Sequence, residues 1–148
     1  MHRLPSGDET LNQSNIVPGM RYRDAHAAID WLCDVLGFER HLVVPDGTGG
    51  VAHAQLTLGS GMIMLGSERE NDEGAVVAPT PTGDLTQSAY IVVEDIEVSY
   101  QRVKDAGANI VMELEEQSYG GSLFAVRDPE GQLWNVGSYD PWAEHEGD

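Results

Sequence analysis

Two stretches of this 148-residue chain decide its fold: IVPGMRYRDAHAAIDWLCDVLG, residues 16–37, and QSAYIVVEDIEVSYQRVKDAG, residues 87–107. Each begins with apolar residues that predict a strand. Each continues with an aspartate, Asp24 or Asp95, whose carboxylate can accept hydrogen bonds from the free N–H groups of a helix's first turn. Each ends on a glycine, the residue that most often follows a helix. The chain therefore contains one strand-helix unit twice.

Three further strands are expected after each helix. The first strands span 16–23 and 87–94, and the helices span 25–36 and 96 to about 106. The strands that follow span 38–44, 51–58, 62–65, 108–114, 122–126 and 133–137. The glycine-rich loop DGTGG, residues 46–50, joins strand to strand and opens no helix, so a hairpin loop is expected rather than a phosphate-binding loop.

The second unit repeats the first at a shift of 71 residues. This shift superimposes identical residues, namely Asp24 on Asp95, Ala54 on Ala125, Gly66 on Gly137 and Ser67 on Ser138. Identities are few, so the repeat is structural more than sequential. The sequence predicts an α+β fold of two tandem β-α-β-β-β modules.

One domain is expected over residues 15–140, with module one at 15–67 and module two at 87–140. A disordered lead-in, 1–14, precedes it, and an acidic tail, 141–148, follows. The linker 68–86 is acidic and contains two prolines, and it is longer than most connections in compact domains. Such a linker is often a lid over a binding site, but plain disorder explains it equally well.

The composition restricts the classes of partner. Asp and Glu total 25 against 8 Lys and Arg, for a net charge of −17, so neither nucleic acid nor an anionic membrane surface is an expected partner. No apolar run is long enough to cross a bilayer, and the N-terminus has no signal-peptide core, so a cytoplasmic protein is expected. Cys33, the single cysteine, cannot form an intrachain disulfide and is expected to be a buried, inert thiol.

Three phrases resemble a known family: IVPGMRYRD at 16–24, VLGFE at 35–39 and RDPEGQLW at 127–134. They are similar to the vicinal oxygen chelate superfamily, which includes glyoxalase I, bleomycin-resistance proteins and extradiol dioxygenases. The resemblance covers about residues 15–140 and is strongest to an uncharacterised glyoxalase-like branch. It implies the glyoxalase/bleomycin-resistance fold, an open, curved, mixed-sheet barrel around a small-molecule cleft, and a homodimer.

The resemblance also indicates where a metal would bind. Metal-dependent members place ligands on the first and last strand of each module, which correspond here to Val17, Met64, Ser88 and Asn135. Valine cannot coordinate, a thioether is unsuited to hard cations, and neutral hydroxyl and amide groups are weak ligands. We therefore expect no metal and no cofactor.

Strand alternation predicts which side chains line the cleft. In the strand 51–58 the apolar residues Ala52, Ala54, Leu56 and Leu58 are expected beneath the helices, which leaves His53, Gln55 and Thr57 on the opposite face. Extending the pattern to the other strands gives the expected ligand-binding residues: Arg21, His53, Gln55, Met64, Tyr90 and Asn135. Met62, Val92 and Leu133 should lie beside them, whereas Trp134 should lie in the core. The positive charge of Arg21 could pair with an anionic ligand group or with one of the chain's many carboxylates.

Three hypotheses about function follow. The leading one is a metal-free protein that binds a small, partly aromatic or cationic molecule in a sequestration or resistance role. The second is a metal-independent lyase- or isomerase-type enzyme in which His53 is the catalytic acid–base group. The third is a degenerate module with a structural or regulatory role. The identity of the ligand does not follow from the sequence.

Overall fold

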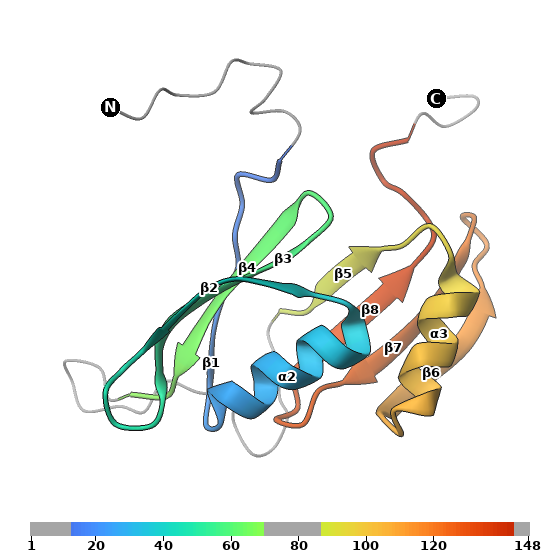
Figure 1. Ribbon diagram of the computed structural model, residues 1–148. Coiled ribbons are helices and arrows are strands. Elements are labelled where there is room, and N and C mark those ends of the chain that lie inside the picture. The colour runs from blue at the N-terminus through green and yellow to red at the C-terminus, as the bar shows by residue number, and fades with distance from the viewer. Residues whose placement is uncertain (1–12, 70–86, 144–148) are drawn as a thin grey trace. The chain divides into compact units, whose positions relative to one another are not determined.

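The computed structural model describes residues 13–69 and 87–143, whose elements divide between two compact units with one module in each (Figure 1). Module one comprises β1 (Gly19–Tyr22), α2 (Ala25–Leu36), β2 (Glu39–Pro45), β3 (Val51–Leu58) and β4 (Gly61–Ser67). Module two comprises β5 (Ala89–Val92), α3 (Ile96–Asp105), β6 (Asn109–Glu116), β7 (Ser122–Arg127) and β8 (Leu133–Gly137). The element order confirms the predicted pair of β-α-β-β-β modules.

Each module has its own open, four-stranded mixed sheet. The strand order is β1-β4-β3-β2 in module one and β5-β8-β7-β6 in module two. The first strand runs parallel to the last, and the other neighbours are antiparallel. The first and last strands of each module are therefore neighbours, although they are far apart in the sequence.

Both helices begin where the sequence predicts. The Asp24 carboxylate accepts a hydrogen bond from the Ala27 N–H at 3.0 Å, and the Asp95 carboxylate accepts one from the Val98 N–H at 3.2 Å. Helix α2 ends at Gly37, whose φ of 88° lies in the left-handed region that favours glycine. These local interactions explain why the helix starts could be predicted from single residues.

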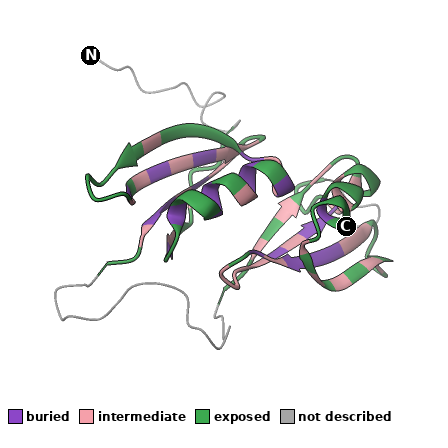
Figure 2. Cartoon of the chain, turned by 60° about the horizontal axis from the view of Figure 1, so that its bottom comes forward, coloured by how far each residue is buried: buried purple, intermediate pink, exposed green. Residues whose placement is uncertain are grey.

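The core of module one lies between α2 and its sheet. Helix α2 contacts all four strands, and its buried face packs on buried strand residues (Figure 2). Leu32 of the helix and Leu56 of β3 are fully buried. Burial of one such side chain stabilises the fold by about 1.5–3 kcal/mol.

The core of module two includes Trp134 of β8, which is 1% exposed, as predicted. Its indole N–H donates to one carboxylate oxygen of the buried Asp128 at 3.1 Å. The other oxygen accepts hydrogen bonds from the backbone N–H groups of Glu130 and Gln132. The sequence RDPEGQLW thus contains a turn in which Trp134 hydrogen-bonds to Asp128.

The first strands are shorter than predicted. Strand β1 begins at Gly19 rather than at residue 16, and β5 spans Ala89–Val92 rather than 87–94. Pro18 lacks an N–H group and cannot donate to the sheet, although its carbonyl still accepts from the Met64 N–H at 2.9 Å. Pro18 therefore explains why β1 begins at Gly19.

The alternation of β3 fails at the start of the strand, where Ala52 is exposed and Val51 is buried. Across β4, Met64 pairs with Gln55, whereas its counterpart Asn135 pairs with Ala125. The shift is 71 residues for Met64 and Asn135 but 70 for Gln55 and Ala125. Val51 and Ser122 match at a shift of 71, since their N–H groups donate to the matched hydroxyls of Ser67 and Ser138, so β3 contains one extra residue between Val51 and Gln55. Ala54 therefore does not correspond to Ala125, and Ala52 is exposed. The alternation holds in the middle of the strand, where Ala54 and Leu56 are fully buried, whereas Leu58 is only half-buried.

The predicted hairpin loop at 46–50 is confirmed, since it joins β2 to β3. The Asp46 carboxylate accepts hydrogen bonds from the Thr48 N–H and hydroxyl, both at 2.8 Å, and from the Gly50 N–H at 3.0 Å. Most of the expected lead-in, linker and acidic tail lies outside the described residues. No helix among residues 13–69 and 87–143 is long and apolar enough to cross a membrane.

Candidate functional site

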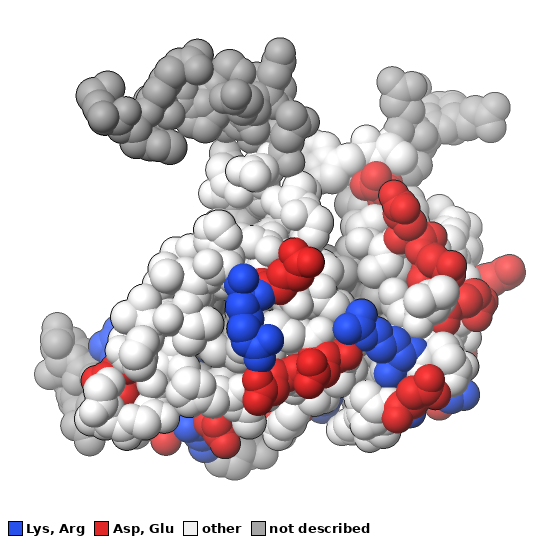
Figure 3. Space-filling model, in the orientation of Figure 1, with Lys and Arg blue, Asp and Glu red and all other residues white. Residues whose placement is uncertain are grey.

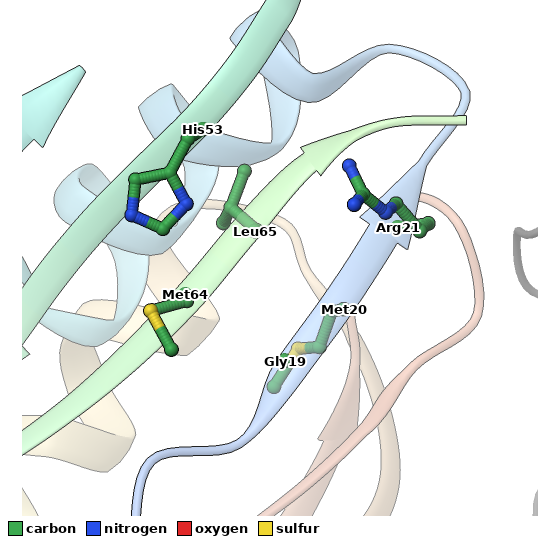
Figure 4. A pocket seen from close by; sticks show the side chains of 6 residues that line it. All are labelled: Gly19, Met20, Arg21, His53, Met64 and Leu65. Atoms are coloured by element: carbon green, nitrogen blue, oxygen red, sulfur yellow. The ribbon is translucent and has the colours of Figure 1, made fainter. Parts of the chain in front are cut away.

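Module one contains a cavity of about 370 Å³ on its sheet. The residues that line it come from three neighbouring strands and are Gly19, Met20, Arg21, His53, Met64 and Leu65 (Figure 4). Three of the residues predicted to bind ligand, Arg21, His53 and Met64, are therefore brought together. The volume lies within the range of small-molecule sites.

Arg21 supplies the positive charge of this cavity. It lies on β1 directly opposite Gly66 of β4, and its guanidinium group donates a long hydrogen bond of 3.4 Å to the Ser67 carbonyl. A side chain at position 66 would collide with this guanidinium group. Within the described part of the chain, Arg21 forms no ion pair with a carboxylate. The sequence allowed two partners for Arg21, a carboxylate of the chain or an anionic ligand group. The described residues provide no such carboxylate, so the anionic ligand group is the partner that remains.

His53 and Gln55 form a hydrogen-bonded pair along β3. The Gln55 side-chain nitrogen lies 3.0 Å from His53 Nε2. An amide nitrogen can only donate, so Nε2 accepts, and the proton of the neutral imidazole is then on Nδ1. His53 lines the cavity, and the ring nitrogen that Gln55 leaves available is a donor.

Met64 supplies an apolar wall of the cavity. It pairs with Gly19 on one side and with Gln55 on the other, so these three residues form one row across the sheet. Gly19 has open space where a side chain would begin. The cavity therefore combines an apolar wall with two donors, Arg21 and His53, which suits a ligand with an apolar part and an acceptor or anionic group.

The two predicted site residues of module two, Tyr90 and Asn135, are partners across β5 and β8. The Asn135 amide nitrogen donates to the Ser88 hydroxyl at 3.1 Å and to the Ala89 carbonyl at 3.2 Å. The Tyr90 hydroxyl donates to the Tyr139 carbonyl at 2.7 Å. Each module therefore holds its own predicted residues, and their convergence on one cavity stays a prediction.

The pKa of Tyr90 is raised above its ordinary value. Burial is the largest cause, because it disfavours the charged phenolate, and the nearby Tyr119, Tyr139 and Asp140 add to it. The hydrogen bond to the Tyr139 carbonyl is not enough to reverse the shift. Tyr90 is therefore a neutral hydrogen-bonding group at physiological pH.

The two matched glycines, Gly66 and Gly137, have a role that sequence reasoning missed. The Tyr90 ring lies where a side chain at position 137 would start, as the Arg21 guanidinium does at position 66. In both modules a long side chain of the first strand thus occupies the space above a glycine of the last strand. The signal was present in the sequence as the match of Gly66 with Gly137 at the 71-residue shift.

The positions that correspond to metal ligands do not fit a divalent metal. Val17 has no donor atom and Met64 offers only a thioether. The Ser88 hydroxyl already accepts a hydrogen bond from the Asn135 amide nitrogen. Across residues 13–69 and 87–143, no three His, Cys, Asp or Glu side chains are grouped so that they could hold a metal ion.

Comparison with known proteins agrees with this architecture. The model of the Glyoxalase/Bleomycin resistance protein/Dioxygenase superfamily matches residues 15–136. An uncharacterized protein of Mycobacterium tuberculosis (strain ATCC 25618 / H37Rv) is 30% identical over 121 residues, which cover 81% of this chain and 71% of that protein. One of Mycobacterium bovis is also 30% identical over 121 residues, which cover 81% of this chain and 80% of the relative.

Solved structures show the same fold. TioX from Micromonospora sp. ML1 is 30% identical, with a TM-score of 0.65 over 84% of this chain and 97% of TioX. A protein of unknown function from Agrobacterium tumefaciens str. C58 has a TM-score of 0.66 at 18% identity, over 84% of this chain and 93% of that one. The fold, the sequence phrases and the family match agree: this chain belongs to the Glyoxalase/Bleomycin resistance protein/Dioxygenase superfamily.

Proposed function

We propose that the chain binds a small organic molecule with an anionic group in the cavity of module one, without a metal ion. The observation that carries the proposal is the position of Arg21. Its guanidinium group lies at the cavity and has one long hydrogen bond to a backbone carbonyl and no carboxylate partner among the described residues. A ligand carboxylate or similar oxyanion would provide the charge-assisted hydrogen bonds that this group lacks.

The rest of the cavity supports the same ligand class. His53 offers a second donor, and Met64 offers apolar surface for a hydrocarbon or aromatic part. This differs from the cationic ligand favoured by the net charge of −17, because the local charge at this cavity is positive. Local charge outweighs net charge here, since contacts within a few Å are much less screened than distant charges.

Benzoate and its neutral analogue benzamide test the proposal. Isothermal titration calorimetry of the full chain should show tighter binding of benzoate. Arg21→Met keeps an unbranched side chain of similar reach without charge, and should weaken benzoate binding by about ten-fold, as expected for the loss of one charged hydrogen bond. Arg23→Met, two residues along, is the matched control and should bind benzoate like the original chain. Equal affinity for benzoate and benzamide, or no effect of Arg21→Met, would contradict the proposal.

Elemental analysis tests the metal-free state independently. Untagged protein should contain far less than one equivalent of Zn, Ni, Mn or Fe per chain, because Val17 and Met64 offer no suitable ligands. About one equivalent of any of these metals would contradict it. A homodimer, which the family resemblance implies, is part of the same proposal, and light scattering that shows a monomer at micromolar concentration would count against it.

A second candidate is a metal-independent lyase- or isomerase-type enzyme with His53 as acid–base group. It is favoured by the N–H of His53, which can donate to a ligand oxygen while Arg21 holds an anionic group. Phenylpyruvate carries both a carboxylate and an acidic C–H bond next to a carbonyl. If the His53 N–H donates to the ketone oxygen while a solvent molecule takes the C–H proton, the protein should accelerate exchange of that C–H in D₂O, measured by proton NMR, and His53→Leu should abolish the acceleration. If phenylpyruvate binds but its exchange is not accelerated, the chain is a binding protein and not an enzyme of this type.

A further inference from the structure

Three tyrosines of module two gather at one end of its sheet: Tyr90, Tyr119 and Tyr139, called here the tyrosine cluster. They come from β5, from the turn between β6 and β7, and from the segment after β8. The rings of Tyr119 and Tyr139 are 5.1 Å apart between centroids and nearly perpendicular, at 83°. The pair is T-shaped, so the edge of one ring meets the face of the other and the two ring planes form a right-angled corner. We infer that this corner binds a small organic cation of the quaternary ammonium class, a site distinct from the cavity of module one.

The tyrosine cluster is held in place by hydrogen bonds of the backbone around it. The Ser122 N–H donates to the Ser138 hydroxyl at 2.9 Å, and the Ser138 N–H donates to the Ser122 carbonyl at 3.0 Å. At Gly121 a side chain would collide with Ser138 and with the Tyr139 N–H, so only glycine allows this approach. The backbone that carries Tyr119 and Tyr139 is thus held in place before any ligand arrives, and the contact between the two rings adds to this order, which reduces the entropy lost on binding.

Two of the three rings, those of Tyr119 and Tyr90, are exposed to solvent, and Tyr139 is half-buried. Tyr119 is 54% exposed and Tyr90 is 39% exposed. The hydroxyl of Tyr90 is engaged by the Tyr139 carbonyl, so the site offers mainly ring faces. Ring faces attract a cation within about 6 Å of their centroids, and a quaternary ammonium group needs no hydrogen-bond acceptor.

The basic residues of module two lie away from the tyrosine cluster, whereas several acidic residues lie near it. Because β5 runs parallel to β8, their C-terminal ends lie together with the start of β7, and α3 begins nearby. The acidic residues at or next to these ends are Glu94, Asp95, Glu97, Glu115, Glu116 and Asp140. Residues 87–143 contain three basic residues, Arg102, Lys104 and Arg127, at the last turn of α3 and the far end of β7. Figure 3 accordingly shows acidic but no basic side chains at the upper end of this module on the face in view.

The lack of basic residues near the tyrosine cluster, within residues 87–143, favours a cationic ligand over an anionic one. Exposed aromatic rings alone would also accept a neutral aromatic molecule. The surrounding carboxylates raise the local concentration of cations and repel anions over distances of about 10 Å. A cation is therefore favoured at the tyrosine cluster, whereas an anion is favoured at Arg21 in module one.

Choline chloride and its neutral isostere 3,3-dimethyl-1-butanol test the inference, because they differ by one charged atom. In NMR titrations of the full chain, choline should shift the resonances of Tyr119 and Tyr139, and the isostere should shift them much less. Tyr119→Leu should weaken choline binding by about three-fold or more, while Tyr119→Phe, which keeps the ring, should retain it. Arg21→Met should not affect choline binding, so failure of the module-one proposal would leave this result unchanged.

Equal shifts with choline and the isostere would overturn the inference, as would choline shifts confined to residues outside the tyrosine cluster. The NMR spectrum of Tyr119→Leu is the folding control. If the other resonances of module two are unchanged, weaker choline binding is caused by the loss of the Tyr119 ring. Unchanged choline binding in a folded Tyr119→Leu variant would also overturn it.

Discussion

Arg21 and Gly66 are direct partners across the parallel strands β1 and β4, and the guanidinium group of one occupies the space above the other. The backbone carbonyl oxygen of Ala52 also lies close, 2.9 Å from the point where a side chain of residue 66 would begin. The position of the charged group therefore depends on the absence of a side chain on the neighbouring strand.

Gly66→Ala should both destabilise the fold and displace Arg21. The added methyl group meets the Ala52 carbonyl, which cannot move without disturbing β3, so a loss of about 1–3 kcal/mol is expected from urea unfolding. In the fraction that remains folded, benzoate should bind more weakly. Gly19→Ala is the control, since position 19 has open space, and its free energy of unfolding should change by less than about 0.5 kcal/mol. A Gly66→Ala variant of unchanged stability would contradict the proposed contact.

Trp134→Ala should be among the most destabilising changes in module two. It removes a buried ring and leaves the buried Asp128 carboxylate without its indole donor. A loss of about 3–5 kcal/mol in the free energy of unfolding is expected. Trp142→Ala makes the same chemical change at a side chain that is 92% exposed, and should stay within about 0.5 kcal/mol. Comparable losses from the two variants would show that Trp134 is not a core residue.

Tyr90 should contribute to a loss of stability at alkaline pH. Since burial raises the pKa of Tyr90, the folded chain holds this proton more tightly than the unfolded chain. The contribution is complete below the ordinary tyrosine pKa of about 10 and is lost as pH rises through the folded-state value. Tyr90→Phe should therefore show a smaller fall in the free energy of unfolding between about pH 9 and about pH 11. Identical pH dependence in both proteins would contradict the raised pKa.

Tyr100 provides the comparison for that experiment. Its pKa is also raised, chiefly by a hydrogen bond to the Glu113 carboxylate. Tyr100→Phe should remove a separate part of the alkaline decline, so the effects of the two substitutions should add. An effect of Tyr90→Phe that disappears in the Tyr100→Phe background would show that the two groups are coupled.

The parts of the fold that depend on local chemistry could be predicted from the sequence. Asp24 and Gly37 act within one turn of α2, so the predicted helix 25–36 agrees with the structure. The start of β1 was predicted too early, because its apolar residues continue past Pro18 while the ladder needs an N–H group. The extra residue of β3 stayed hidden because Ala54 and Ala125 are identical, and only the pairing with β4 and β8 shows it.

Of the residues predicted to bind ligand, three line the cavity of module one, and their chemistry there could not be predicted from the sequence. Alternation along the strands is a local property, and it placed Arg21, His53 and Met64 on one wall. Whether Arg21 meets a carboxylate depends on which of 25 acidic residues comes within a few Å, and that is a property of the folded chain. The donor character of His53 likewise depends on the amide of Gln55, two residues away along β3.

The hydrogen bond between Gln55 and His53 can be tested directly. If the Gln55 amide donates to His53 Nε2, the neutral ring carries its proton on Nδ1, and nitrogen-15 NMR of the imidazole should show that tautomer. Gln55→Leu removes the donor, so the Nε2–H tautomer that predominates in free imidazoles should gain population. Thr57→Val, on the same strand and face, should leave the His53 spectrum unchanged. If the original chain instead shows its proton on Nε2, His53 presents an acceptor rather than a donor to the cavity. Benzoate would then depend on Arg21 alone, and His53→Gln would leave its affinity unchanged.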